Sequence, residues 1–542
     1  MKLKYKVLSL VMFVMLICCV SAASAADVDN ITVPDDTSVI EIDDAVDSVD
    51  EVESEGIDDT ADNDDSASQT RGMVTPTTYQ SFFDPTTGYI TTSDSNLIFS
   101  GNFDNITFDT FRINKNVVMN AYGATFINKA FDLQTSDIVL NGGTFKWNST
   151  TPFNSVITIK GSNTTVNGAT ISVTALNNTD CYAFDLQNAN HATLSNNIIT
   201  YVDTYANPTN YNYAVKIKGG SYNKMVGNNI TAFMPLKDVD YTNYTTRFPS
   251  IDLDLVAGVA VESSSNFNFT GNKLNVTGNL RAGYYPTLDA LLIVKSDNVN
   301  VIGNQIYEQD SVSKKDDTNY LYAVDIYRCN NIKICSNKIE LNSNGGNLTV
   351  NGTGAAYGIQ LTGPHTGVVI CNNNITTANN GPNLGIYSQN TQGATNLTIY
   401  GNRINVTGKA GNNPWALVSG MELQDTYAEV YNNVINVNNI AGYHAGYCAY
   451  GISYSQSTSG DHYYNIHNNN VNVVNGDYSV YLMNSTSVSG KVEENTLKAI
   501  GNVTISGDNA VFAPSEVSVI FNDWYLFMIL IHFFIFFDSY AL

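Results

Sequence analysis

An eight-residue pattern recurs along this chain and constrains its fold more than any other feature. Apolar residues alternate with polar ones, an Asn follows, and an aliphatic residue stands two places after the Asn. Residues 192–199 read ATLSNNII, and residues 397–404 read LTIYGNRI. The Asn falls at ten positions, 26 to 44 residues apart: Asn197, Asn228, Asn272, Asn304, Asn337, Asn373, Asn402, Asn433, Asn469 and Asn495.

The residues around each Asn predict short β-strands. The residue two places after the Asn is aliphatic in all ten copies, and the residue three places before it is apolar in all ten. Alternation with a period of two is typical of strands rather than helices. A second segment, such as 182–186 (YAFDL), comes earlier and puts a small residue 14 positions before the Asn in five copies. Each copy therefore predicts a coil of about three strands.

A single coil of this kind cannot bury its own apolar face. Stacking coils about 4.8 Å apart buries a continuous core and pairs every strand with the next coil. Weaker copies begin at residue 117 and carry Gly143 and Ala169 at the Asn place. We therefore expect a parallel solenoid over residues 117–512.

We interpret the Asn column as structural rather than catalytic. Asn adopts left-handed backbone conformations readily and bonds to neighbouring backbone groups, which suits a tight turn. In stacked coils, the amides of successive Asn residues can form a hydrogen-bonded ladder.

The regions outside the repeat differ from it in composition. Residues 1–26 combine three Lys, an apolar run and small residues, which is typical of a secretory signal peptide. The acidic leader covers 27–74, and its residues 27–70 hold 17 acids and no Lys or Arg, which predicts disorder. Residues 75–116 are expected to cap the first coil. The apolar tail, 513–542, is consistent either with a membrane anchor or with the end of a truncated or frame-shifted gene.

Charge and cysteine content exclude several classes of function. The formal net charge is −24 and no basic patch occurs, so nucleic acid is not an expected partner. Five Cys remain after the signal peptide, and none forms a C-x-x-C pair, so neither a disulfide scaffold nor a structural zinc site is predicted. The His residues show no metal-ligand spacing and are expected in surface loops. No cofactor or metal is predicted.

The coil motif resembles the right-handed parallel β-helix repeat shared by pectin lyases, periplasmic copper-processing proteins and many surface proteins. That resemblance implies an all-β, single-stranded, right-handed parallel β-helix of about 12–13 coils. The wider arrangement is similar to the adhesin-like surface proteins of methanogenic archaea. It implies a secreted, extracellular cell-surface protein with an adhesive or structural role. Its partners would be a carbohydrate, a cell-wall polymer or another cell surface, with a membrane as a further contact through the tail.

A polysaccharide lyase or hydrolase of the pectin-lyase-like fold is the alternative. A hydrolase needs paired carboxylates, and a lyase needs a calcium-binding acid cluster with a base. Asp252 and Asp254 lie two apart on a possible strand, while Asp185, Lys216 and Asp325 share one outward column. We favour a solvated sheet face for this column, so no catalytic residue is predicted.

Tyrosines supply the candidate contact surface. Four stand just before the small residue and two stand two places before the Asn: Tyr182, Tyr213, Tyr322, Tyr357, Tyr400 and Tyr431. An exposed aromatic ladder would offer rigid contact area to sugars or to a protein. Stacking within the solenoid is the competing interpretation.

Cys335 and Cys371 both stand two residues before a ladder Asn. They should lie on neighbouring coils, near 4.8 Å apart at Cα. This separation is within disulfide range, but in-register stacking directs both Cβ atoms the same way. We therefore expect a stacked pair of reduced thiols.

Overall fold

The computed structural model of the chain describes residues 71–150, 154–176, 182–204, 212–234, 256–278, 287–310, 320–344, 355–389, 396–411, 416–424, 427–444, 447–455, 462–476, 478–482, 488–499 and 519–520. These residues all belong to one compact unit, Ala67–Leu542. The signal peptide, the acidic leader up to residue 70, Asp252, Asp254 and all of the apolar tail except 519–520 lie outside the described residues.

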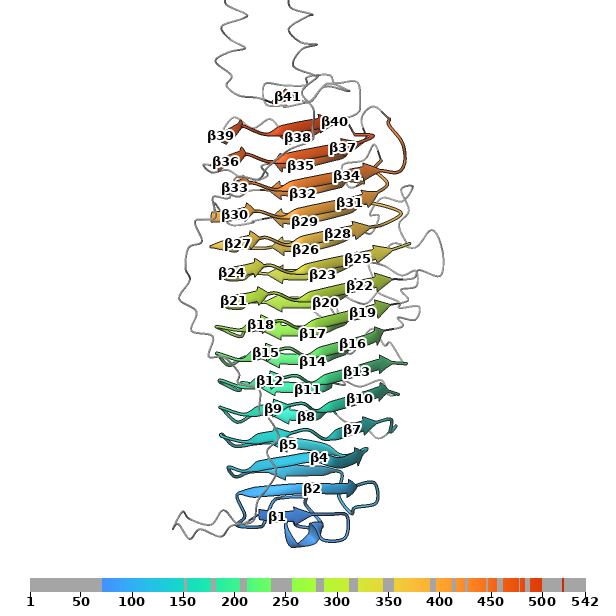
Figure 1. The fold of residues 1–542 in the computed structure, drawn as a ribbon, viewed down its shortest axis with the longest axis vertical. Helices are drawn as coiled ribbons and strands as arrows, with labels where there is room; N and C mark the ends of the chain where they lie inside the picture. Colours follow the sequence, from blue (N-terminus) through green and yellow to red (C-terminus); the bar gives the residue numbers. More distant parts are fainter. Residues whose placement is uncertain are drawn as a thin grey trace, which may run out of the picture. The chain divides into compact units, whose positions relative to one another are not determined.

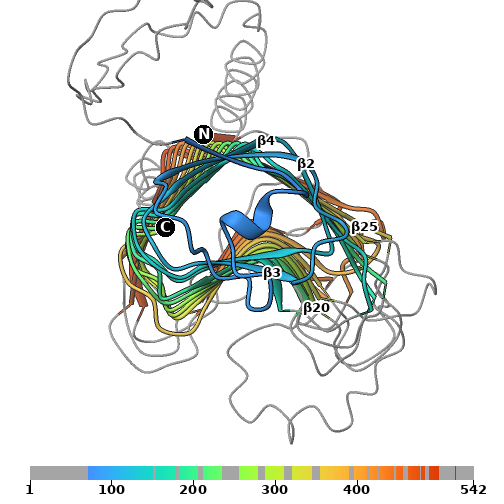
Figure 2. The same ribbon diagram turned by 90° about the horizontal axis from the view of Figure 1, so that it is seen from below.

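The described chain is a right-handed parallel β-helix, as the coil repeat predicts (Figure 1). Two parallel sheets run along it, one of 28 strands (sheet 1) and one of 13 (sheet 2). Each coil contributes one strand to sheet 2 and then, in complete coils, two to sheet 1. Seen along the axis, the coils lie on top of one another around a common interior (Figure 2).

Sheet 2 contains β3 (Thr110–Ile113), β5 (Ala130–Leu133), β8 (Ser155–Ile159), β11 (Tyr182–Gln187), β14 (Asn212–Lys218), β17 (Val256–Glu262), β20 (Thr287–Val294), β23 (Tyr320–Tyr327), β26 (Ala356–Thr362), β29 (Asn383–Gln389), β32 (Val418–Gln424), β35 (Ala449–Ser455) and β38 (Tyr478–Leu482).

The strands of sheet 1 that precede each Asn turn are β6 (Val139–Asn141), β9 (Thr165–Asn167), β12 (Thr193–Ser195), β15 (Lys224–Val226), β18 (Asn268–Thr270), β21 (Asp297–Ile302), β24 (Asn330–Cys335), β27 (Val368–Cys371), β30 (Asn396–Tyr400), β33 (Tyr427–Tyr431), β36 (His462–His467) and β39 (Val488–Glu493).

The strands of sheet 1 that follow the turn are β7 (Thr144–Trp147), β10 (Thr170–Ala175), β13 (Ile198–Asp203), β16 (Asn229–Met234), β19 (Lys273–Gly278), β22 (Gln305–Asp310), β25 (Lys338–Ser343), β28 (Asn374–Ala378), β31 (Arg403–Gly408), β34 (Val434–Asn439), β37 (Asn470–Val474) and β40 (Thr496–Ala499). In the first coil, β4 (Val118–Ile127) takes both places, because it pairs with both β6 and β7.

The small residue of each sheet 2 strand is required by close packing against the next coil. A Cβ atom on Gly258 would lie 2.5 Å from Val276 Cγ2 and 2.8 Å from the Ala290 carbonyl oxygen. The parallel register passes from the pair Ala257–Asp289 to the pair Val259–Leu291 and leaves this residue unpaired. Only a small side chain fits at this irregularity, where the chain turns toward the interior.

The N-terminal end is closed by β1 (Arg71–Val74), a short 3₁₀ turn η1 (Tyr79–Ser81) and β2 (Asn96–Asn102). β1 pairs with β2, β2 with β4, and β3 with β5, all in parallel. Parallel pairing therefore begins upstream of residue 117, inside the segment assigned to the cap. At the other end, β41 (Val519–Ile520) pairs antiparallel with β40.

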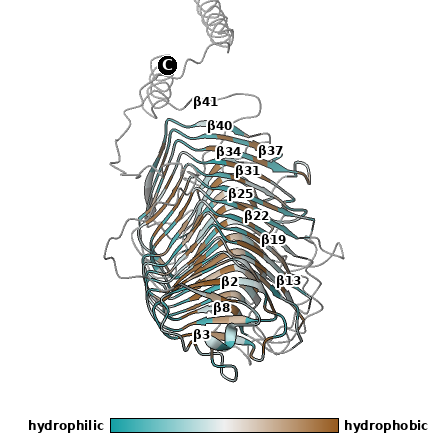
Figure 3. Cartoon of the chain, turned by 60° about the horizontal axis from the view of Figure 1, so that its bottom comes forward, coloured by the Kyte–Doolittle hydropathy of each residue, from teal (hydrophilic) through white to brown (hydrophobic). Residues whose placement is uncertain are grey.

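Hydrophobic residues alternate with hydrophilic ones along the strands (Figure 3). The buried hydrophobic residues form one core cluster that runs along the solenoid. On β13 the burial pattern is exposed, buried, exposed, buried, and Ile199 and Tyr201 point inward. No helix in the described part of the chain is long and apolar enough to span a membrane.

Candidate functional site

The turn that carries each ladder Asn depends on the residue before it. That residue has a φ between 54° and 67° in all ten turns, and it is Gly in four of them and Asn in four. Both residue types tolerate the left-handed conformation. The ladder Asn residues themselves do not have positive φ. Sequence analysis gave the left-handed role to the ladder Asn, and the structure gives it to the preceding residue.

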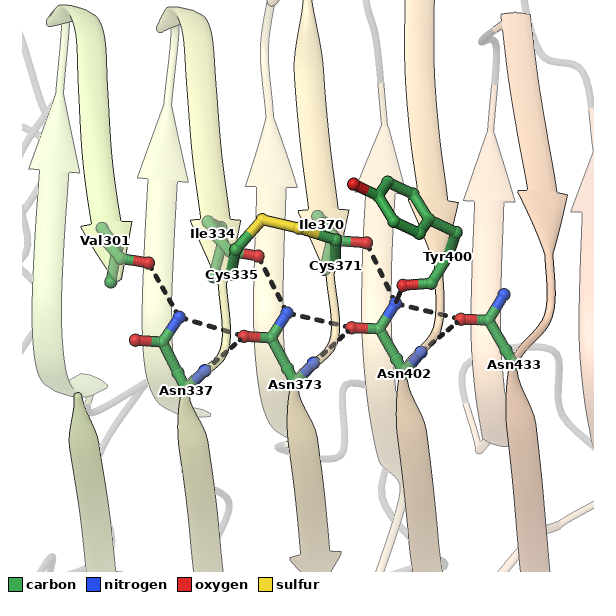
Figure 4. Close-up of a disulfide and its surroundings, with 10 residues drawn as sticks. All are labelled: Val301, Ile334, Cys335, Asn337, Ile370, Cys371, Asn373, Tyr400, Asn402 and Asn433. Atoms are coloured by element: carbon green, nitrogen blue, oxygen red, sulfur yellow. Dashed lines mark hydrogen bonds between the residues drawn. A yellow bond between two sulfur atoms is a disulfide. The ribbon is translucent and has the colours of Figure 1, made fainter. Parts of the chain in front are cut away.

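The ladder amides from Asn197 to Asn469 bond to the coils on both sides, and Asn373 is typical (Figure 4). Its Oδ1 accepts from the backbone N–H of Asn337 at 2.9 Å and from Asn337 Nδ2 at 3.0 Å. Its Nδ2 donates to the Ile334 carbonyl at 2.8 Å and to Asn402 Oδ1 at 2.9 Å. All four hydrogen-bonding positions of the side chain are thus occupied.

The ladder runs without interruption from Asn197 to Asn495. Each member donates through Nδ2 to Oδ1 of the next. All ten side chains are at most 2% exposed. A buried and saturated amide has no capacity left for a ligand, so this column holds coils together and does not form a binding site.

Cys335 and Cys371 form a disulfide between β24 and β27, so the prediction of reduced thiols was wrong (Figure 4). Their Cα atoms are 4.6 Å apart, inside the usual disulfide range of about 4.4–6.8 Å. The prediction gave too much weight to the parallel Cβ directions, because rotation about the Cα–Cβ bonds brings both sulfur atoms into the gap between the strands. Cys329 is a free buried thiol, and burial raises its pKa to about 12.

Three tyrosines of the predicted contact surface are buried. Tyr182, Tyr213 and Tyr322 are 2%, 1% and 8% exposed, so their assignment to an exposed surface was wrong. Tyr182 and Tyr213 stack on each other at 6.0 Å and belong to an apolar cluster with Leu292 and Val294 on the outer face of sheet 2. An outward direction in a strand does not ensure exposure, because most outward residues of this face between β11 and β23 are buried. Tyr357 is half-buried, and the centroid of its ring lies 5.1 Å from that of Tyr322.

Tyr400 and Tyr431 remain partly exposed on the outer face of sheet 1. Their rings stack at 5.1 Å with an interplanar angle of 6°, and His467 continues the stack at 5.2 Å and 6°. His467 Nε2 lies 2.9 Å from Glu429 Oε1, which also accepts from Asn465. Because the rings cover one another's faces, they present edges and hydroxyl groups outward. Such a column favours hydrogen bonding to a ligand over stacking on sugar rings.

The acids of the outward sheet 2 column are not solvated, contrary to our interpretation. Asp185 and Asp325 are 4% and 5% exposed. Lys216 is paired in register with Asp185, and its Nζ donates to Tyr182 Oη at 3.1 Å. The structure therefore brings Asp185, Lys216 and Tyr182 together and leaves Asp325 three coils beyond Lys216.

Glu422, in the same column, was not singled out by the sequence. Burial raises its pKa to about 7, and a hydrogen bond from Gln424 partly offsets this. Asp325 and Glu422 stand on β23 and β32, three strands apart, or about 14 Å at 4.8 Å per strand. Glycosidase carboxylates lie about 5–9.5 Å apart. Asp289 is nearer to Asp325, on the adjacent β20, but it has no exposed surface.

His365 is buried, whereas the sequence placed it in a surface loop. Its Nδ1 lies 2.9 Å from the Gly363 carbonyl oxygen and its Nε2 lies 3.2 Å from Ser388 Oγ. Burial lowers the pKa of His365, which favours the neutral ring. Among the described residues, no group of three or more His, Cys, Asp or Glu is arranged to hold a metal ion.

Comparisons with known proteins find similarity to solved structures alone. No protein-family model and no curated protein matches the chain. Among solved structures, 23 chains match. The Dettilon tailspike protein is 14% identical, with a TM-score of 0.33, over 71% of this chain and 68% of its own. PfbA, a surface adhesin of Streptococcus pneumoniae, is 11% identical, with a TM-score of 0.33, over 75% and 85%. A polygalacturonase from Erwinia carotovora ssp. carotovora is 10% identical, with a TM-score of 0.20, over 80% and 99%. Likenesses of this size carry no information on function.

Proposed function

We propose that this chain is a secreted cell-surface β-helix protein with an adhesive or structural role, and that it contacts carbohydrate or cell-wall polymers. The Cys335–Cys371 disulfide is the observation that carries the proposal. Disulfides persist in oxidising compartments such as the cell exterior and are rare in the reducing cytosol. A secretory signal peptide at residues 1–26, expected from the sequence, agrees with this location.

The bonding between coils supports a structural role. Ten buried ladder amides and one covalent bridge join successive coils along most of the solenoid. Its solvent faces carry Asn, Thr, Gln and Tyr, which are suited to hydrogen bonding with hydroxyl-rich polymers. A rigid rod with such faces fits adhesion or wall structure better than it fits chemistry at a single pocket.

The proposal is tested by binding and by turnover in the same samples. Purified protein is incubated with a panel of neutral and acidic polysaccharides, and co-sedimentation is measured together with new reducing ends and unsaturated products. Saturable binding to at least one polymer, without product formation, is expected. Sustained product release would overturn the adhesive role in favour of an enzyme.

A polysaccharide-degrading enzyme is the second candidate, and Glu422 is the observation in its favour. With a pKa near 7, this carboxyl is partly protonated at neutral pH, as a general acid must be. If it acted so, Glu422→Gln would abolish turnover while the bound fraction stayed unchanged. If the wild type releases no product in the panel, the enzymatic candidate fails.

A further inference from the structure

The outer face of sheet 1 carries a straight row of cations and amides. Register pairs Lys273 with Gln305, Gln305 with Lys338, Lys338 with Asn374, and Asn374 with Arg403. The row runs across the five successive strands β19, β22, β25, β28 and β31, and all five side chains are exposed. We call these five residues the cation–amide row.

The spacing of the row is regular because strand spacing is regular. Neighbouring strands lie about 4.8 Å apart, so each cation of the row stands about 9.6 Å from the next one along the solenoid axis. An amide lies between each pair of cations. The row therefore offers charge, hydrogen-bonding groups and charge again along a straight line, which matches a linear polymer better than a compact ligand.

The charge of this face is opposite to that of the whole chain. The net charge of the chain is −24, yet Glu340 is the only acid among the outward residues of these five strands, and it is bonded to Lys338 at 2.8 Å. The remaining outward positions are Asn, Gln, Thr and Tyr, with one Ala: Asn275, Thr277, Tyr307, Gln309, Asn342, Thr376, Ala378, Asn405 and Thr407. Other outward acids of sheet 1, namely Asp297, Glu429 and Glu493, lie on β21, β33 and β39, which precede the Asn turn and do not belong to these five strands.

We propose that the cation–amide row binds a linear anionic polysaccharide laid parallel to the solenoid axis. This rests on the proposed function and deepens it, because it names the class of polymer and the face that holds it. The cations pair with carboxylates or sulfates of the polymer, and Gln305 and Asn374 bond its hydroxyls. Exposed pairs of this kind are screened by salt, so binding weakens as ionic strength rises.

The test compares polygalacturonate with its fully methyl-esterified form, which has the same backbone without charge. The full chain is produced in a host without N-glycosylation, because Asn374 and Asn405 begin Asn-x-Thr sequons. The row variant replaces Lys273, Lys338 and Arg403 by Gln. The control variant replaces Lys146, Lys224 and Lys491 by Gln, which are exposed cations of sheet 1 outside the row, so both variants have the same net charge.

Wild type and control are expected to bind polygalacturonate and to bind the ester at least roughly tenfold more weakly, with affinity falling as salt rises. The row variant should lose roughly tenfold or more in affinity for polygalacturonate and keep the same melting temperature. Equal binding of the two polymers, or an equal loss in row and control variants, would overturn the inference. If the protein binds neutral polymers alone and the row variant binds them unchanged, the inference fails and the proposed function stands. If the protein binds no polymer in either test, both the inference and the proposed function fail.

Discussion

The first coils and the later coils of this solenoid are held together in different ways. From β2 to β7 the interior is aromatic, and rings stack between coils: the centroids of Phe103 and Phe126 are 5.1 Å apart, and those of Phe126 and Phe145 are 4.8 Å apart. From Asn197 onward the turn carries the Asn ladder, and the residues that flank it inside are mainly aliphatic. The same backbone repeat is thus joined by two kinds of side-chain contact, ring stacking in the first coils and the Asn ladder in the later ones.

Gly143 shows why ring stacking and the Asn ladder do not occur in the same coil. It occupies the ladder place in its coil, and a Cβ atom there would lie 2.8 Å from a ring carbon of Phe145. The aromatic ring fills the space that a ladder side chain would need. Ala169, in the next coil, donates its backbone N–H to Asn197 Oδ1 at 2.9 Å and ends the ladder. The difference teaches that a ring two residues after the ladder position takes the space of the amide, whereas Phe269, three residues before Asn272, is compatible with the ladder.

The largest expected loss of stability comes from a charged residue within the ladder. In Asn304→Asp, the new carboxylate oxygen would face the Phe269 carbonyl and Asn337 Oδ1, which now accept from Asn304 Nδ2 at 2.8 Å and 2.9 Å. Three oxygen atoms would then face one another with no proton between them. We expect a loss of about 3–5 kcal/mol in the free energy of unfolding at neutral pH, measured by urea titration.

The matched control is Asn470→Asp on the exposed face of β37. It adds the same charge outside the ladder and should change stability by less than about 0.5 kcal/mol. Lowering the pH should restore part of the stability of the ladder variant, because protonation returns a donor. Equal effects at the two sites would mean that the ladder adds nothing to stability.

Smaller changes in stability are expected when Asn is introduced at the ladder positions of the first coils. Gly143→Asn should cost about 1–3 kcal/mol, because the side chain meets Phe145 and because Gly143 has a φ of +95°. Ala169→Asn should instead add a ladder position and gain about 1 kcal/mol by bonding to Asn197 and to the Leu140 carbonyl. Thermal unfolding of both variants, followed by circular dichroism, checks the opposite signs. A stabilising Gly143→Asn would show that the ring and the ladder are compatible.

Much of this architecture could be predicted from the chain, and the failures have a common physical origin. The repeated Asn and its aliphatic neighbours predict strands that form stacked coils. The prediction works because the apolar positions indicate which side of each strand is buried. The predictions for Tyr182, Tyr213 and Asp325 were wrong because strand alternation gives the direction of a side chain and not its exposure. Most outward residues of sheet 2 between β11 and β23 are buried. The disulfide and the pKa of Glu422 depend on side-chain rotation and on distant packing, which a repeat pattern does not contain.

The last expected effect concerns an acid inside the ladder region, at the position that Trp147 occupies on β7 and Val173 occupies on β10. Glu308 points into the interior from β22 and has no exposed surface. Burial raises its pKa well above the usual range, the neighbouring Asp310 raises it further, and the backbone of Tyr322 lowers it in part. The folded state therefore holds a proton that the unfolded state releases above about pH 4.3. Stability falls as the pH rises from there to the pKa of the folded state, and it levels off above that. Glu308→Gln removes the titrating group and keeps the size of the side chain, so it should gain on the order of 1–2 kcal/mol at pH 8 and nothing at pH 4. Urea titrations of both proteins across this pH range measure the difference, and Glu340→Gln on the outer face of β25 is the control. A gain that does not depend on pH would show that Glu308 is already ionised in the fold.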